Sequence, residues 1–468
     1  MRFAWRGLIV SGVAATLAGC ATLAPDGGVD RVNELVRERN VAVPIAAVDA
    51  DDSGTRARVD ALLAQPLTPE AAVEIAIRRN PGVRARVAQL AAADAERVQA
   101  GRLANPSFTF SDKRSSEIRA IERTLMINVM SLVMLPLNQK LAARRFEEAQ
   151  LRLAGEAVAL AADTRRAWFR AVAADEQLAY FEQAHEAASA ASELASRMRA
   201  VGNFSQLQRL REQAFSADTA AALARARYAA VAERERLLRL LGLWGTEAEI
   251  RLPARLPALP ASAVAPDDAE RIAMERRVDV LAAKRAAEAS AESLELTRVT
   301  RFVNVLHVGY TNESEGGEPR KDGYEVEVEL PLFDFGDAKA KRAESTYAAA
   351  LEHARDVAVN ARSDVRERFV AYRTAYDLAR HYRDEIVPLR KAISEEMLLR
   401  YNGMLVGVFE LIADAREQIA SVNFAIEATR DFWIAESHFQ QALLGGTSAG
   451  GSIAAPASFP AAGGGGGH

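Results

Sequence analysis

The sequence has a single cysteine and few aromatic residues, and it lacks an excess of charge of either sign. Of its 468 residues, one is Cys and 6% are Phe, Trp or Tyr, and the formal net charge is −4. One cysteine excludes an internal disulfide and Cys-rich zinc or iron–sulfur sites. The missing basic excess argues against a nucleic-acid partner. Few aromatic and many alanine residues favour closely packed helices over a large compact core.

Signatures of catalysis are also missing from the sequence. It contains no Gly-rich phosphate loop and no His-x-x-x-His pair, and no set of residues suggests a nucleophile triad. We therefore expect a protein that is not an enzyme and that needs no cofactor or resident metal.

The one cysteine, Cys20, lies at the end of a secretory pattern. Two arginines precede the short apolar run Leu8–Leu17, and Leu17-Ala18-Gly19-Cys20 follows. These last four residues resemble a bacterial lipobox, in which the cysteine is lipidated and becomes the mature N-terminus. The alternative is a buried structural cysteine after an ordinary signal. The pattern predicts a signal peptide over residues 1–19 and a lipid anchor at Cys20, which tethers a protein without spanning the bilayer.

Long proline-poor stretches indicate unusually long helices. Residues 20–66 mix Pro, Gly and charges, and we expect an extended segment there; Thr68 before Pro69 then predicts a helix N-cap. No proline occurs between Pro136 and Pro253, and apolar residues recur there every seven positions. A helix from about Asn138 to Arg199 would be about 90 Å long. An ordinary bundle of shorter helices is the alternative.

The chain contains an internal duplication. Each copy has a glycine at the reversal between two helices, Gly202 and Gly403, then an Arg-Glu-Gln triplet, and each ends at a Leu-Gly pair. These features divide the chain into parts that we state as predictions: a first repeat over 67–252, a Pro-rich joint over 253–266, a second repeat over 267–445 and a disordered Gly-rich tail over 446–468.

A pair of strands is expected inside each copy. The clearest is Tyr324–Leu332, where apolar residues alternate with Glu325, Glu327 and Glu329. Its expected partner is Phe302–Thr311, across a loop over residues 312–319. In the first copy the expected strands are Pro106–Asp112 and Thr124–Leu137, and on the second of these we place three methionines on one strand face: Met126, Met130 and Met134.

Strands of about ten residues with one apolar and one polar face fit a transmembrane β-barrel. Four strands cannot close a barrel, and an open sheet in lipid would leave backbone groups unpaired. Other copies must complete the sheet, and cyclic symmetry does so with one repeated interface. Two copies would give an eight-stranded barrel, whose interior is filled by side chains. Three copies, with 12 strands, are therefore the smallest number that leaves an aqueous lumen.

These residues resemble the TolC family of outer-membrane efflux proteins. The resemblance rests on the lipobox signal, the duplicated helix–strand–strand–helix–helix unit and Leu-Pro-Leu entering a long helix. It also rests on the segment from Glu385 to Pro388, followed by Tyr401-Asn402-Gly403 and Phe409-Glu410-Leu411. The lipidated start resembles the OprM- and CusC-type branch of that family.

The resemblance implies a fold, a location and partners. The fold is mainly α with a β-barrel portion: a long periplasmic coiled-coil α-barrel and a trimeric 12-stranded transmembrane β-barrel. The implied function is the exit duct of a tripartite efflux or type I secretion system in the bacterial outer membrane, with a large periplasmic part. A periplasmic adaptor and an inner-membrane transporter of the RND or ABC type would be its partners, and no nucleic acid would bind.

Several residues are candidates for roles in such a duct. Glu325, Glu327 and Glu329 would line the lumen and favour cations, or would simply hydrate the wall. Family members close their periplasmic end partly with aspartates; here Glu410 and Asp414 could form an acidic ring near the hairpin tips, or they lie on a solvated helix face. The three methionines could bind Cu(I), with His307 nearby, or pack as ordinary hydrophobic residues.

Two other function classes remain open from the sequence. One is a non-channel periplasmic coiled-coil lipoprotein that acts as a structural spacer, which would not need the alternating strands. The other is the periplasmic adaptor itself, in which a single helical hairpin would be expected without duplication. The cargo, whether drug, metal ion, solvent or peptide, is not encoded in a recognisable motif.

Overall fold

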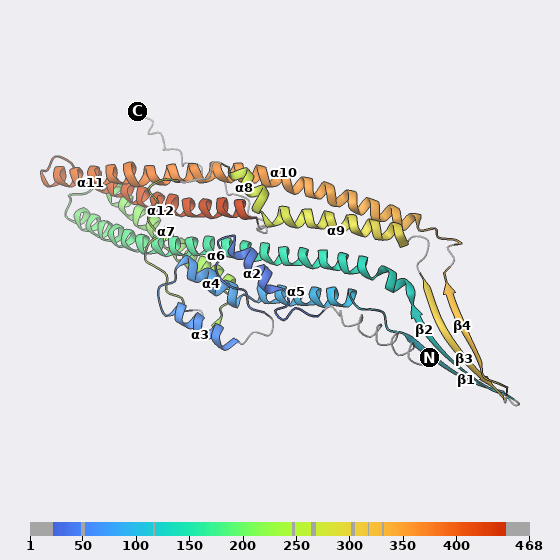
Figure 1. The fold of residues 1–468 in the computed structure, drawn as a ribbon. Coiled ribbons are helices and arrows are strands. Elements are labelled where there is room, and N and C mark those ends of the chain that lie inside the picture. Colours follow the sequence, from blue (N-terminus) through green and yellow to red (C-terminus); the bar gives the residue numbers. More distant parts are fainter. Residues whose placement is uncertain are drawn as a thin grey trace.

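Long helices lie side by side in the molecule, and a small sheet extends from one end of them (Figure 1). The computed structural model describes residues 22–47, 52–115, 118–245, 249–263, 268–300, 305–316, 318–329 and 332–445. The predicted signal peptide over residues 1–19, the lipid anchor at Cys20 and the tail over 446–468 lie outside these described residues.

Two helices precede the first repeat, α2 (Val29–Arg37) and α3 (Asp52–Leu63). The prediction of an extended segment over residues 20–66 is therefore wrong for these parts. In α2 the apolar residues recur every three or four positions, and they pack in one cluster with side chains of α6. The stretch with this periodicity is short and is surrounded by Pro, Gly and charged residues, so the sequence pattern alone does not specify a helix. Packing against the long helix α6 stabilises it.

The first repeat folds in the predicted order of helix, two strands and two helices. Its elements are α4 (Pro69–Arg79), α5 (Pro81–Ala100), β1 (Ser107–Arg114), β2 (Arg119–Asn128), α6 (Val129–Ala200) and α7 (Gln206–Leu241). Thr68 caps α4 as predicted, since its side chain accepts a hydrogen bond from the Ala71 N–H.

The second repeat follows the same order. Its elements are α8 (Ala269–Arg276), α9 (Val278–Thr300), β3 (Leu306–Glu315), β4 (Lys321–Val328), α10 (Asp337–His381), a π-helical turn (Tyr382–Ile386), α11 (Val387–Asn402) and α12 (Val408–Leu444). The mainly helical fold with four strands and a duplicated unit is thus confirmed.

The boundary between strand and helix in the first repeat differs from the prediction. We expected a strand over Thr124–Leu137, but β2 ends at Asn128 and α6 begins at Val129. The Asn128 side chain accepts a hydrogen bond from the Ser131 N–H at 2.9 Å and so caps the helix. With 72 residues, α6 is about 110 Å long, longer than expected.

The corresponding long helix of the second repeat is interrupted. Pro388 lies at the start of α11, directly after the π-helical turn Tyr382–Ile386. Proline cannot donate to the preceding turn and its ring crowds the carbonyl four residues earlier, so the wider turn accommodates it. In contrast, α6 is α-helical throughout, although it contains Pro136 in its third turn.

The four strands form one antiparallel sheet in the order β1-β2-β3-β4. The central pair joins the two repeats, since β2 pairs with β3, and β1 and β4 are left as the edges. We expected a loop over residues 312–319, but residues 312–315 belong to β3. Glu313 pairs with Lys321 of β4, and the last two residues of β3 pair with β2.

The long helices form a layer, and the helices at its two lateral ends have a neighbour on one side only among the described residues. On the side near the sheet, α6 packs on α5 and α9, and α9 packs on α10. Toward the other end the order is α7, α6, α12 and α11. The two repeats meet in the middle, where the Phe169 and Trp433 rings stack with centroids 5.3 Å apart.

Each repeat ends where its last helix meets the junction of its first two helices. Gly242 ends α7 with φ +68°, and a Cβ there would lie 2.7 Å from the Arg79 carbonyl oxygen. Gly445 follows α12 with φ +82°, and a Cβ there would lie 2.6 Å from the Val278 nitrogen. Both predicted glycine stops are confirmed, and only glycine fits either position.

Candidate functional site

Two regions at opposite ends of the molecule carry the candidate functional residues (Figure 1). One is the sheet, and the other is the pair of hairpin tips between α6 and α7 and between α11 and α12. More than 100 Å of helix separates them, since α6 alone links β2 to the first tip.

The sheet has a polar face that contains two of the three predicted glutamates. Glu325 and Glu327 lie on it, and Glu327 accepts a hydrogen bond from the Nδ1 atom of His307 at 2.8 Å. Residues directly opposite one another in an antiparallel sheet point to the same side. The same face therefore includes the Thr124 and Thr311 hydroxyls, which are 3.1 Å apart. Glu329 lies one residue beyond β4.

The opposite face of the sheet is apolar near the helices, and its side chains are exposed. They are Phe108, Leu125, Ile127, Val308, Tyr310, Tyr324, Val326 and Val328, with 39–86% of each residue accessible. Apolar side chains continue beyond the sheet, where Phe333 is 99% exposed. A contiguous exposed apolar surface of this kind marks a site of interaction with lipid or protein.

The three methionines do not share a strand face, so that prediction is wrong. Met126 is in β2 and covers Gly309 on the polar face, where a Cβ would lie 2.2 Å from the Met126 sulfur. Met130 and Met134 are in α6, and Met134 is buried. In the described part of the chain, no group of three or more His, Cys, Asp or Glu side chains is arranged to hold a metal ion.

The first hairpin tip reverses at Gly202 as predicted. Gly202 has φ +85°, and the Asn203 N–H donates to the Met198 carbonyl at 2.9 Å. Ser205 and Gln208 then form a capping box for α7. The tip is thus built from residues with the conformational preferences that the turn requires.

The second hairpin tip places its left-handed residue one position later than the predicted glycine. Gly403 has φ −80°, whereas Met404 has φ +60° and is 93% exposed. A non-glycine residue in this conformation carries a cost of about 1 kcal/mol. With Leu405 also exposed, the tip presents an apolar surface to its surroundings.

The predicted acidic pair lies on α12 next to this tip, in two different environments. Glu410 is exposed, and its carboxylate folds back over Gly407. Asp414 is only 9% exposed, and its Oδ2 atom has no hydrogen-bond partner among the described residues. The two side chains therefore do not form one continuous solvated face in the single chain.

A contact between the two hairpins was missed by the sequence reasoning. Arg416 Nη2 lies 3.4 Å from the buried Glu212 carboxylate, and the guanidinium stacks over the Phe215 ring at 4.3 Å. Glu212 and Arg416 belong to the two Arg-Glu-Gln triplets that marked the duplication. The repetition of this triplet was the sequence signal for the contact, although the spacing alone did not show that the two triplets meet.

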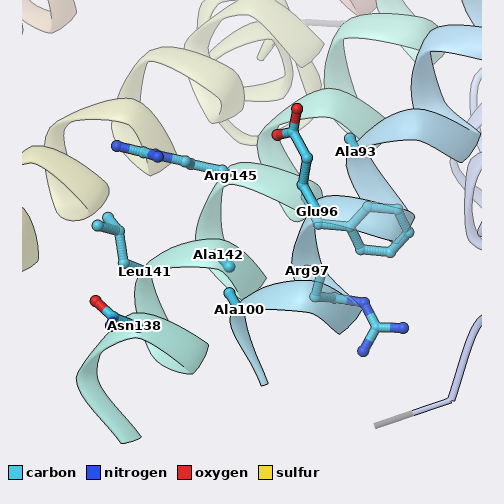
Figure 2. A pocket seen from close by; sticks show the side chains of 9 residues that line it. Ala93, Glu96, Arg97, Ala100, Asn138, Leu141, Ala142 and Arg145 are labelled. Carbon is cyan, nitrogen blue, oxygen red and sulfur yellow. The ribbon is translucent and has the colours of Figure 1, made fainter. Parts of the chain in front are cut away.

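A cavity of about 210 Å³ lies between α5 and α6 (Figure 2). Figure 2 shows Ala100 and Ala142 beside one another at the seam, with the charged side chains of Glu96 and Arg145 at its rim. None of the nine residues that line it in the described part of the chain is Ser, Thr, Cys or His. The cavity is a gap left by the small side chains at the seam between the two helices.

Among the described residues, no helix has the length and apolar character needed to cross a membrane.

Comparisons with known proteins identify the fold. No protein-family model matches the chain, and no curated protein matches it. Solved structures do match. They include the CmeC outer membrane channel of Campylobacter jejuni, with a TM-score of 0.70, 13% identity, and coverage of 81% of this chain and 86% of that one.

Two further matches have similar values. The outer membrane protein VceC of Vibrio cholerae has a TM-score of 0.67 and 14% identity, with 81% and 96% of the two chains covered. The open MtrE outer membrane channel of Neisseria gonorrhoeae has a TM-score of 0.65 and 16% identity, with 81% and 89% covered. For the single chain, the mainly helical fold with four strands that the resemblance implies is confirmed: this chain has the fold of these outer membrane proteins.

Proposed function

We propose that three copies of this chain form an exit duct across the bacterial outer membrane. The observation that carries the proposal is the sheet, which has one polar face, one exposed apolar face and two edges that pair with no other strand in the described part of the chain. An open sheet of this kind cannot rest in lipid, because its edge donors and acceptors would be unsatisfied. Three copies joined edge to edge would give a closed 12-stranded barrel with the glutamates inside.

Exposed apolar stripes on the lateral helices support the same closure. In α7, Leu210 and Val231 are exposed and lie three heptads apart. On the opposite edge, Val359 and Val370 in α10 are exposed and three helical turns apart, so they share one side of the helix. Ring closure would bury each stripe against the next copy, which extends the repeated interface from the sheet along the helices.

The proposed partners follow from the two ends of the duct. The hairpin tips, with Gly202, Gly403, Glu410 and Asp414, would meet a periplasmic adaptor and act as the gate. An inner-membrane transporter of the RND or ABC type would deliver the cargo. Cys20 would carry the lipid anchor in the outer membrane. The matched structures are described as outer membrane channels, and this supports the proposal.

The alternatives fit the observed chain less well. A coiled-coil spacer or an adaptor would have no use for a sheet with an exposed apolar face, and the chain has two helical hairpins rather than one. A passive duct uses every one of these features without requiring a catalytic residue.

Neighbouring positions on opposite faces of β4 allow a matched test. Val326→Asp puts a charge on the face proposed to contact lipid, where it should abolish trimers in outer-membrane fractions. Glu327→Gln changes the polar face one residue away and should leave trimers intact. Equal trimer yields from the two variants would show that the faces are not oriented as proposed.

The glutamates provide a second test, of selectivity. In three copies, Glu325 and Glu327 would form rings in the lumen, with Glu329 at its lower rim, and such rings favour cations. Neutralising all three as glutamines should shift the reversal potential under a salt gradient in planar bilayers. An unchanged reversal potential would mean that these side chains only hydrate the wall.

A further inference from the structure

Charged side chains are sorted between the two faces of the sheet at the end farthest from the helices. Arg114, Arg119 and Arg123 share the face on which the apolar residues lie, as the strand register shows. Glu122 and Glu313 are opposite one another on the polar face. The outward face therefore changes from apolar to arginine-rich along the strands.

Two of these arginines form an unfavourable pair. Arg114 and Arg119 are directly opposite in the register of β1 and β2, and like charges in such positions repel. Both guanidinium groups turn to one carboxylate, that of Asp112, at 3.0 and 2.9 Å. Their side chains remain 65% and 53% exposed. One carboxylate shared by two guanidinium groups leaves donors available to a further anion.

The third arginine, Arg123, lies two same-face positions closer to the helices than Arg119, next to the apolar residues, and has a neutral partner. Arg123 donates to the Asn312 amide oxygen at 3.2 Å. The nearby Asp322 carboxylate accepts hydrogen bonds from the Tyr310 hydroxyl at 2.8 Å and from Asn312 at 2.6 Å. The row as a whole therefore presents positive charge that its own carboxylates do not balance.

We propose that Arg114, Arg119 and Arg123 bind the phosphate groups of anionic lipid headgroups at the outer surface of the membrane. The inference rests on the proposed function, because that function turns the apolar face toward acyl chains and puts the β1–β2 turn on the outside. Guanidinium groups bind phosphate oxygens in a bidentate manner. Their position just beyond the apolar rows is the depth at which headgroup phosphates lie.

The test compares lipid retention by full-length protein. Purified trimers are reconstituted in vesicles of phosphatidylcholine containing phosphatidic acid and re-extracted, and the bound lipids are counted by native mass spectrometry. We expect wild-type protein to retain phosphatidic acid preferentially. The R114Q/R119Q/R123Q variant should lose this preference several-fold, and R114K/R119K/R123K, which keeps the charge but not the bidentate geometry, should be intermediate.

A matched control and a competitor make the result decisive. The K113Q/K321Q variant removes two positive charges from the polar face and should retain phosphatidic acid as the wild type does. If trimers of R114Q/R119Q/R123Q retain as much phosphatidic acid as the wild type, the inference is overturned. This result is expected if a neighbouring copy neutralises the three arginines. Complete displacement by inorganic phosphate would overturn it as well. Trimer mass and conductance report separately on the proposed duct.

Discussion

The two helical hairpins have the same plan but differ in how firmly they are built. The first runs through an uninterrupted α6 and turns at a glycine with a capping box. The second has a π-helical turn before Pro388, a left-handed Met404 at its tip, and an α11 in which no residue is buried. All residues of α11 are described, so this is a property of the whole helix.

Unsatisfied polar groups also concentrate in the second hairpin. Asp414 Oδ2, Arg416 Nε and Ser421 Oγ in α12 are buried without a hydrogen-bond partner among the described residues. Buried polar atoms without partners are costly, and they mark places where a structure can rearrange. We therefore expect the second hairpin to be the less stable of the two.

The ends of the repeats should respond most strongly to substitution. Gly445→Ala and Gly242→Ala force a side chain into a left-handed backbone and against a neighbouring backbone atom. We expect each to lower the free energy of unfolding by about 3 kcal/mol. Gly245 has a positive φ, but a Cβ there would have no neighbour within 4 Å, so Gly245→Ala measures the cost of the left-handed backbone without the steric clash. Thermal or denaturant unfolding measures all three, and equal losses for all three variants would refute the steric part of the argument.

Loss of the contact between the hairpins should come next. Arg416→Met leaves the Glu212 carboxylate, which is 2% exposed, without this cationic partner. We expect a loss of about 2 kcal/mol, less than for a fully buried pair because Arg416 is partly exposed. The double variant Arg416→Met/Glu212→Gln should recover part of this loss. A double variant no more stable than Arg416→Met would show that the pair is not coupled.

A histidine in α12 should make the second hairpin sensitive to mild acid, whereas α7 contains no histidine. Burial, together with the nearby Arg166, Arg368 and Arg170, lowers the pKa of His438 to about 3. Because the folded pKa lies below the ordinary value of about 6.5, this contribution is full above pH 6.5 and is lost as the pH falls toward 3.

A substitution at His438 isolates this effect. Between pH 6.5 and pH 4, the His438→Gln variant should lose less free energy of unfolding than the wild type does. We expect a difference on the order of 1–2 kcal/mol, after allowance for the partial exposure of the ring. Unfolding curves measured across this pH range provide the comparison, with His353→Gln on α10 as a control. A variant that still loses stability as steeply as the wild type would contradict the assignment.

Exchanging the residues at the two tips should have the smallest effect. Met404→Gly removes the side chain from a left-handed position and should slow amide exchange at the second tip, while Gly202→Ala should speed it at the first. Each change corresponds to about 1 kcal/mol. Hydrogen exchange measured peptide by peptide resolves both tips in one experiment, and shifts in the opposite directions would reverse our ranking of the hairpins.

Local sequence signals predicted much of this fold. Thr68 with Pro69, the glycines at positions 202, 242 and 445, and the alternation around Glu325 and Glu327 each specify backbone geometry within a few residues. The end of β2 was missed because an apolar run fits a strand and a buried helix equally well, and only the Asn128 cap separates them.

Features that depend on contacts between distant segments were not predictable in the same way. Glu212 and Arg416 are more than 200 residues apart, and their meeting depends on how the two hairpins pack. The row of arginines on the sheet emerges only from the strand register, since Arg114, Arg119 and Arg123 belong to two strands whose alignment sets their common face.

Single-channel recording of purified full-length protein in planar bilayers tests the central claim most directly. If three copies close the sheet into a water-filled duct, trimers will insert and carry current in discrete steps, and Val326→Asp protein will not insert. Trimers that insert stably but carry no current, or a folded protein that remains monomeric in the membrane, would contradict the account.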